Sequence, residues 1–111
     1  MTVSVRAGTL LAGLPDAAAG ERITPLLATP GARIEQIVSA GQASPDGFWY
    51  DQDQAEFVRL LAGTAGLRIE GETEVRELRA GDYMLLPAHC RHRVERTSAA
   101  PPAVWLAVHL S

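Results

Sequence analysis

Short segments in which apolar and polar residues alternate, separated by turns rich in Gly, Pro, Asp and Ser, fill most of this 111-residue chain from residue 32 onward. Alternation with a period of two is typical of strands that bury one face. The turn signals recur about every eight to twelve residues, as in an antiparallel sandwich or barrel. No segment of about 10–15 residues with helical periodicity separates the strands, which argues against a parallel α/β sheet. We therefore expect an all-β fold of about nine short strands.

The expected boundaries divide one domain into an arm and a barrel. Residues 1–31 form an N-terminal arm and first strand, and residues 32–111 form the barrel, one end of which is capped by Leu10, Leu11 and Leu14. Turns are expected at residues 41–47, 51–54, 63–66 and 98–102. Strands are expected at residues 33–38, 48–50, 56–62, 67–70, 74–78, 83–86, 91–96 and 103–110. In the last strand, the expected core positions are Val104, Leu106 and Val108.

Charge and cysteine content narrow the functional classes. The net charge is −3 and the isoelectric point is about 5.5, so the expected partner is neither nucleic acid nor an anionic membrane, both of which need a basic surface. The single cysteine, Cys90, allows no intrachain disulfide, which fits a reducing compartment. The first residues do not resemble a signal peptide, and no apolar run approaches the roughly 20 residues that span a bilayer. We expect a soluble, cytoplasmic protein.

His92 is expected to point into the barrel. In the strand over residues 91–96, Arg91, Arg93 and Glu95 share one face, while His92 and Val94 share the other. The charged face must be solvated, so the histidine faces inward and needs a partner for its ring nitrogens. A metal ion is one such partner. The alternative is a core histidine bonded to Glu56 or to a backbone carbonyl.

Glu56 is expected to be a carboxylate at the edge of the apolar interior. It shares a strand face with Val58 and Leu60, while Phe57 and Leu61 lie on the other. An unpaired buried carboxylate costs several kcal/mol or becomes protonated. A metal ion, a histidine partner or a hydrogen-bond network would offset that cost; the alternative roles are a partner for His92 or for Arg59.

Two motifs in the chain resemble those of the cupin superfamily. The run Gly81-x5-Pro87-x-His89-x2-His92 is similar to the second cupin motif, with His89 where glycine is usual. The run Glu56-x6-Gly63 is similar to the end of the first motif. Two alternative spacings place Tyr50 and Gln52, or Trp49 and Asp51, at the two histidine positions that precede the glutamate. The resemblance covers residues 34–110 and is closest to small single-domain bacterial cupins.

The resemblance implies a jelly-roll barrel with a divalent metal ion inside, which would be Fe, Mn, Ni or Zn. The implied metal ligands are Gln52, Glu56 and His92. Further ligands, or hydrogen-bond partners of ligands, are expected among Asp51, His89 and His109. His109 shares a strand face with Trp105 and Ala107. The expected pocket-lining aromatic residues are Trp49 and Tyr50.

Two functions are consistent with these residues. The first is a metal-dependent protein that acts on a small organic molecule in the barrel, with the metal as a Lewis acid. The second is a non-catalytic module that binds a small molecule or a metal, as a sensor does; the missing early histidines favour it. We also expect a homodimer, because Phe57 and Leu61, on either side of Arg59, would suit a face covered by a second subunit.

Overall fold

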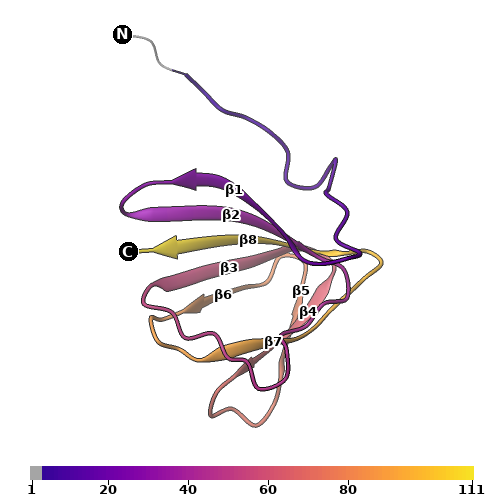
Figure 1. Ribbon diagram of the computed structural model, residues 1–111, viewed down its shortest axis with the longest axis vertical. Helices are drawn as coiled ribbons and strands as arrows, with labels where there is room; N and C mark the ends of the chain where they lie inside the picture. Colours follow the sequence, from indigo (N-terminus) through magenta and orange to yellow (C-terminus); the bar gives the residue numbers. More distant parts are fainter. Residues whose placement is uncertain (1–3) are drawn as a thin grey trace.

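The computed structural model describes residues 4–111, and these residues form eight β-strands and no helix. Five strands make an antiparallel sheet in the order β1-β2-β8-β3-β6, and three make a second sheet in the order β5-β4-β7 (Figure 1). The strands are β1 (Arg22–Ala28), β2 (Ala32–Ser39), β3 (Ala55–Ala62), β4 (Thr64–Ile69), β5 (Arg76–Arg79), β6 (Tyr83–Leu86), β7 (His92–Thr97) and β8 (Ala103–Leu110). The predicted all-β, double-sheet architecture is confirmed.

Two of the predicted elements differ from the observed ones. Residues 48–50 form no strand; Tyr50 makes only an isolated bridge to His92. The turn expected at residues 63–66 is confined to Gly63, because β4 already begins at Thr64. Gly63 has φ +76°, a conformation open to glycine at little cost, and it carries the chain from the large sheet to the small one in a single residue.

The interior between the two sheets is apolar, and alternate residues of β3 point into it, as predicted. Val58 and Leu60 are buried on the same side of the strand as Glu56. They belong to a cluster that draws on both sheets and also contains Ala65, Leu67, Leu78, Leu86, Ala103, Trp105 and Ala107. Four members of this cluster, Val58, Leu67, Leu86 and Trp105, also line the cavity of the barrel.

Both faces of β8 are covered. Trp105 and Ala107 belong to the interior cluster, whereas Val104 packs with Val38 and Ala17 in a separate cluster. The core positions expected at Val104, Leu106 and Val108 are thus fully buried only at Val104, because the other two are partly exposed. The inward face of the strand is the opposite one.

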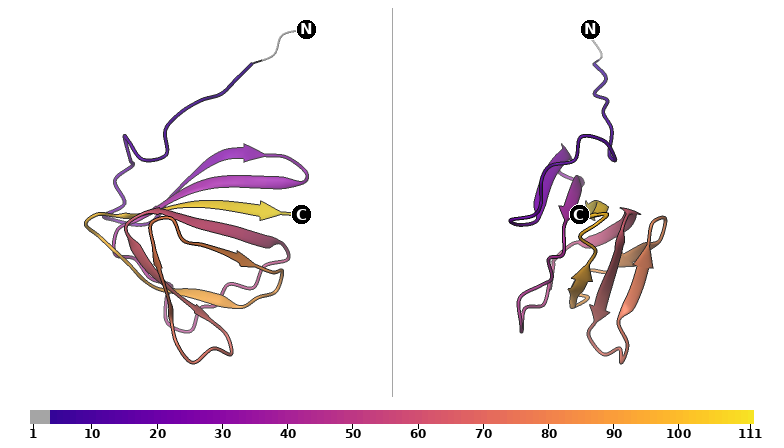
Figure 2. Two further views of the ribbon diagram at one scale, coloured as in Figure 1. Left: turned by 180° about the vertical axis from the view of Figure 1, so that it is seen from behind. Right: turned by 90° about the vertical axis from the view of Figure 1, so that its right-hand side faces the viewer.

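The N-terminal segment covers the second cluster instead of capping the barrel end. Leu14 packs against this cluster, and the side-chain amide of Gln36 in β2 donates a 2.9 Å hydrogen bond to the carbonyl of Leu10. Leu11 is exposed. Figure 2 shows the segment leaving the barrel on the side of β1 and β2, far from the small sheet. Residues 1–3 of the expected arm lie outside the described residues.

β1 is one edge of the large sheet. It is exposed along its whole length, and its pairing with β2 shifts register between Pro25 and Leu27. Proline has no N–H to offer a further strand, and a register shift of this kind twists an edge. Among the described residues, no helix is long and apolar enough to cross a membrane.

Replacement of Gly63 by alanine is expected to destabilise the protein by about 2–4 kcal/mol. A Cβ atom there would lie 2.6 Å from the carbonyl oxygen of Pro102 and 2.6 Å from Oγ of Ser98, in addition to the strain of a positive φ. The matched control is Gly71→Ala, because Gly71 has φ +91° but open space around its Cβ position; it should lose only about 1 kcal/mol. Urea unfolding measures both, and equal losses would show that the close contact at Gly63 adds nothing.

Candidate functional site

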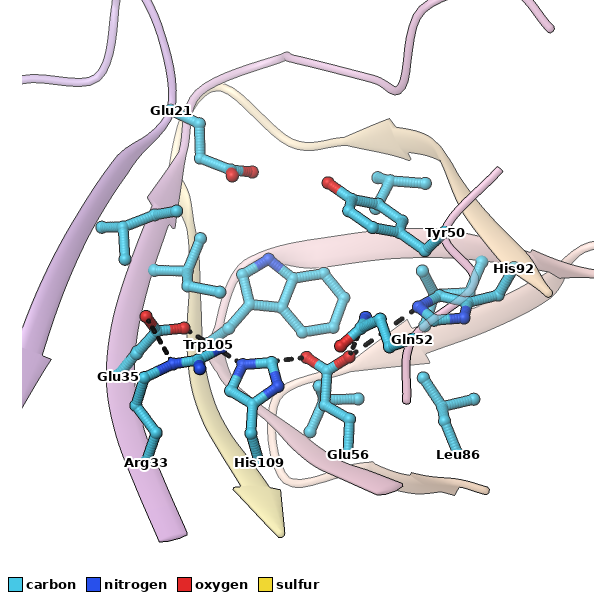
Figure 3. Close-up of a pocket in the computed structure, with 15 residues that line it drawn as sticks. Glu21, Arg33, Glu35, Tyr50, Gln52, Glu56, Leu86, His92, Trp105 and His109 are labelled. Carbon is cyan, nitrogen blue, oxygen red and sulfur yellow. Dashed lines mark hydrogen bonds and ion pairs between the residues drawn. The ribbon is translucent and has the colours of Figure 1, made fainter. Parts of the chain in front are cut away.

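A cavity of about 290 Å³ lies between the two sheets and collects most of the candidate residues (Figure 3). Strands of both sheets and the loop before β3 contribute to its wall. Its apolar lining consists of Ile23, Ile37, Val58, Leu67, Leu86, Val94 and Trp105. Its polar lining consists of Glu21, Arg33, Glu35, Tyr50, Gln52, Glu56, His92 and His109. Polar groups therefore converge in a largely apolar enclosure, which is the usual composition of a small-molecule site.

His92 points inward, as its strand alternation predicted. The residue is buried, and its Nδ1 lies 2.8 Å from the carbonyl oxygen of Cys90. A carbonyl accepts only from N–H, so in the neutral imidazole the proton is on Nδ1 and Nε2 carries a free lone pair. Tyr50 stacks on the ring, with centroids 5.2 Å apart, and holds its plane. The backbone-carbonyl contact of the alternative interpretation is present, but it uses only one of the two ring nitrogens.

Glu56 faces this lone pair. Its Oε1 lies 3.8 Å from Nε2 of His92, too far for a hydrogen bond, and accepts a 3.1 Å hydrogen bond from the amide nitrogen of Gln52. The carboxylate is buried at the end of β3 that opens into the cavity. A bare imidazole nitrogen and a carboxylate oxygen are both electron-pair donors, so this arrangement favours a cation between them.

His109 enters the cavity from β8, on the same strand face as Trp105, as expected. Its Nε2 lies 3.1 Å from Oε1 of Glu35 and 3.9 Å from Oε2 of Glu56. The other oxygen of Glu35 lies 3.3 Å from Nε of Arg33. Nδ1 of His109 is buried and, within the described residues, has no hydrogen-bond partner. The imidazole is thus placed between two carboxylates.

Sequence reasoning did not find Arg33, Glu35 and Glu21. Arg33 and Glu35 alternate with Ile37 in β2, and this spacing was the available signal, because it puts all three on one strand face. The opposite face of β2, with Ile34 and Val38, is the more apolar one, so the pattern alone would direct Arg33 and Glu35 away from the barrel. Glu21 precedes β1 and carries no periodic signal at all.

Tyr50 lines the cavity as predicted, whereas Trp49 does not. Burial raises the pKa of the Tyr50 phenol, and the carboxylates of Glu21 and Glu56 raise it further. The phenol therefore stays protonated at neutral pH and is available as a hydrogen-bond donor. Trp49 lies outside the lining, where the guanidinium of Arg91 is 5.7 Å from the centroid of its ring.

His89 and Asp51 lie away from Glu56 and His92. The side chain of His89 is 66% exposed, and its Nδ1 lies 2.9 Å from Oδ1 of Asp51 at the surface. The residue has φ +62°, a left-handed conformation, at the corner where glycine is usual in the resembled motif. Neither residue lines the cavity.

The donors of the expected metal set fit a divalent ion in part. His92 Nε2 and Glu56 Oε1 are separated by less than twice a typical metal–ligand distance of about 2.1 Å, so one ion could contact both. Gln52 would have to rotate its amide to present the oxygen, since its nitrogen now donates to Glu56. Residues 4–111 contain no group of three or more His, Cys, Asp or Glu side chains placed to hold a metal ion. The fit therefore rests on two strong donors and an amide.

Comparison with known proteins places this geometry in a family. The cupin-domain model matches residues 35–109. A structure described as a "putative mannose-6-phosphate isomerase", from Ralstonia eutropha JMP134, is 50% identical, with 96% of this chain and 99% of that chain covered and a TM-score of 0.92. No curated protein matches the chain.

Two more distant structures share the fold. A protein from Thermus thermophilus is 19% identical, with 96% and 97% of the two chains covered and a TM-score of 0.77. An RmlC-like cupin protein from Desulfovibrio desulfuricans is 15% identical, with 97% of each chain covered and a TM-score of 0.75. The family match includes the segment that carries Glu56, His92 and His109, and the chain belongs to the cupin family.

Proposed function

We propose that this cupin binds a divalent metal ion through Glu56 and His92, with Gln52 as a third ligand, and acts on a small organic molecule in the cavity. The observation that carries the proposal is the free Nε2 lone pair of His92 aimed at the Glu56 carboxylate across 3.8 Å. In the absence of a cation, burial of two electron-pair donors side by side is unfavourable. A divalent ion removes this cost.

The hydrogen bond from His92 Nδ1 to the Cys90 carbonyl supports this role. It fixes the tautomer and the orientation of the ring, as hydrogen bonds to the second nitrogen of metal-binding histidines do. A bound divalent ion would supply Lewis acidity, which polarises an oxygen of the ligand or of water. The mixed nitrogen and oxygen donors suit Fe, Mn, Ni or Zn.

Other residues of the cavity would handle protons and orientation. His109, between Glu35 and Glu56, can accept or release a proton at an imidazole nitrogen beside the proposed ion. The protonated phenol of Tyr50 can donate a hydrogen bond to an oxygen of the bound molecule. The apolar side chains of the lining, among them Val58 and Trp105, limit the access of water.

The name of the Ralstonia eutropha protein suggests a sugar phosphate, but the charges of the cavity favour a different ligand. Among the described residues, the one guanidinium of the lining is that of Arg33; it is already paired with Glu35, and two further carboxylates line the wall. Phosphate recognition normally requires unpaired Arg or Lys side chains or a cluster of backbone N–H groups. We therefore do not extend isomerisation of mannose 6-phosphate to this chain.

The second candidate function is a non-catalytic binding module. One observation that favours it is the amide of Gln52, which stands where a third charged or imidazole ligand would bind a metal more strongly. A second is the contact of His109 with Glu35, itself paired with Arg33, because it engages a histidine that could otherwise serve as acid or base. The two candidates differ in turnover, not in binding. A screen of small carbonyl and hydroxy compounds with the metal-loaded protein separates them, since only the first predicts product.

Replacement of His92 by alanine is expected to weaken metal binding by more than about 10–100-fold. Loss of a residue that only hydrogen-bonds to a metal ligand typically costs about 10–100-fold, and His92 would itself be a ligand. Glu56→Gln should have a similar effect. His89→Ala is the matched control, because His89 is exposed and outside the cavity. Elemental analysis of purified proteins measures retained metal. A wild-type protein that holds no metal, and gains no thermal stability from added Fe, Mn, Ni or Zn, would contradict the proposal.

We also propose that the protein is a homodimer associated through the outer face of the large sheet. Phe57 of β3 stacks on Tyr83 of β6 with centroids 5.4 Å apart, and it pairs across the sheet with Leu85 and Val108. Tyr83 and Leu85 are 65% and 60% exposed. Large apolar side chains in one exposed row are typical of a face that meets a partner.

The substitution Leu85→Glu is therefore expected to convert a dimer into a monomer, because it places a charge in the middle of this row. Light scattering coupled to size exclusion should give twice the chain mass of 11.9 kDa for the wild type and the single mass for the variant. Leu11→Glu, at an exposed leucine of the N-terminal segment, is the control and should remain dimeric. A wild-type protein of single mass would overturn the homodimer.

A further inference from the structure

The lining of the cavity carries more negative than positive charge. Glu21, Glu35 and Glu56 supply three carboxylates, and Arg33 supplies one guanidinium. Nε of Arg33 lies 3.3 Å from Oε2 of Glu35, so this positive charge is already neutralised locally. With a divalent ion at Glu56 and His92, the carboxylate of the lining that is left without a positive partner is that of Glu21, so this end of the cavity attracts a cationic group and repels an anionic one.

The centre of the cavity is an aromatic surface. Trp105 is buried in the interior cluster and lines the cavity. Figure 3 shows its indole in the middle of the lining, with the side chains of Glu21, Glu35 and Glu56 around it. The face of an indole attracts cations more strongly than that of any other side chain. An aromatic face surrounded by carboxylates favours an ammonium group over a neutral or negative one.

Glu21 marks the end of the cavity opposite the proposed metal ligands. Its Oε2 accepts a 3.1 Å hydrogen bond from the hydroxyl of Ser39, a fully buried residue of β2. This bond fixes the carboxylate at the cavity wall although the residue itself is exposed. Glu21 and Glu56 thus line the cavity on opposite sides of the indole of Trp105 (Figure 3).

We propose that the cavity binds a small organic cation whose ammonium group lies between Glu21 and the indole face of Trp105. The volume of about 290 Å³ is at the lower limit of the usual range of about 300–1,000 Å³, so the ligand has only a few carbon atoms. This ligand class deepens the proposed function, on which it rests: the far end of the molecule would face Glu56 and His92.

Three probes of the same length test the charge preference. These are 4-aminobutan-1-ol, butane-1,4-diol and 4-hydroxybutanoate, which differ only in one terminal group. Calorimetric titration of the full chain, metal-free and metal-loaded, measures their affinities. In the metal-free protein the amine should bind at least about tenfold more tightly than the diol, and the carboxylate should bind most weakly; in the metal-loaded protein the amine should keep its advantage over the diol.

The variant Glu21→Gln tests the position of the ammonium group. It keeps the shape of the side chain and removes its charge, and it should weaken amine binding by about threefold to fivefold, as expected for one partly screened charge pair. Binding of the diol should not change. Glu74→Gln is the matched control, because Glu74 is an exposed glutamate outside the cavity lining, and it should leave both affinities unchanged.

The proposal is overturned if the amine does not bind, if the diol binds as tightly as the amine, if the carboxylate does so in the metal-free protein, or if Glu21→Gln leaves amine binding unchanged. Retention of metal by a protein without preference for the amine would refute the cationic ligand and leave the metal site standing. Preference for the amine in a protein that binds no metal would refute the metal site alone.

Discussion

The register between β3 and β8 is the constraint on which the candidate site depends. Glu56 pairs with His109, and Leu60 pairs with Trp105 four residues further along β3. Because side chains alternate between faces, a slip of β3 by one residue would turn Glu56 out of the barrel, away from His109, and bring Phe57 in. Burial of Leu60 and Trp105 in the interior opposes such a slip. The hydrophobic core therefore fixes the position of polar groups that contribute nothing to it.

The loop before β3 is held by backbone hydrogen bonds in addition to its side-chain contacts. Tyr50 N donates to the His92 carbonyl at 2.7 Å, His92 N donates to the Tyr50 carbonyl at 3.1 Å, and His89 N donates to the Gln52 carbonyl at 2.7 Å. Side chains at positions 50 and 52 can therefore differ from the histidines of the resembled motif without displacing the loop. The backbone thus fixes positions 50 and 52 independently of the side chains that they carry.

The sequence was sufficient for most of the strands and for the inward residues of β3 and β7. It was insufficient for β8, where both faces are largely apolar and the inward face is opposite to the expected core positions. It was insufficient for Glu35, since both faces of β2 are covered, one by the cavity and one by the N-terminal segment. It was also insufficient for Glu21, whose place is set by a hydrogen bond to Ser39 from a distant strand. The aromatic run at residues 48–50 suggested a strand, but the chain there makes only one bridge. The alternation of polar and apolar residues along a strand carries no information about contacts that depend on tertiary packing.

The exposed edge strand β1 has a consequence for how copies of the chain can meet. An unpaired strand edge is a template for uncontrolled sheet extension, which leads to fibrous aggregates. Pro25 withholds one amide hydrogen from that edge, and the shift between Pro25 and Leu27 interrupts the spacing of the remaining donors and acceptors. A second chain would find no continuous ladder to join. This edge of the large sheet is thereby protected against open-ended polymerisation, while Tyr83 and Leu85 stay exposed on the sheet face for closed, symmetrical contact.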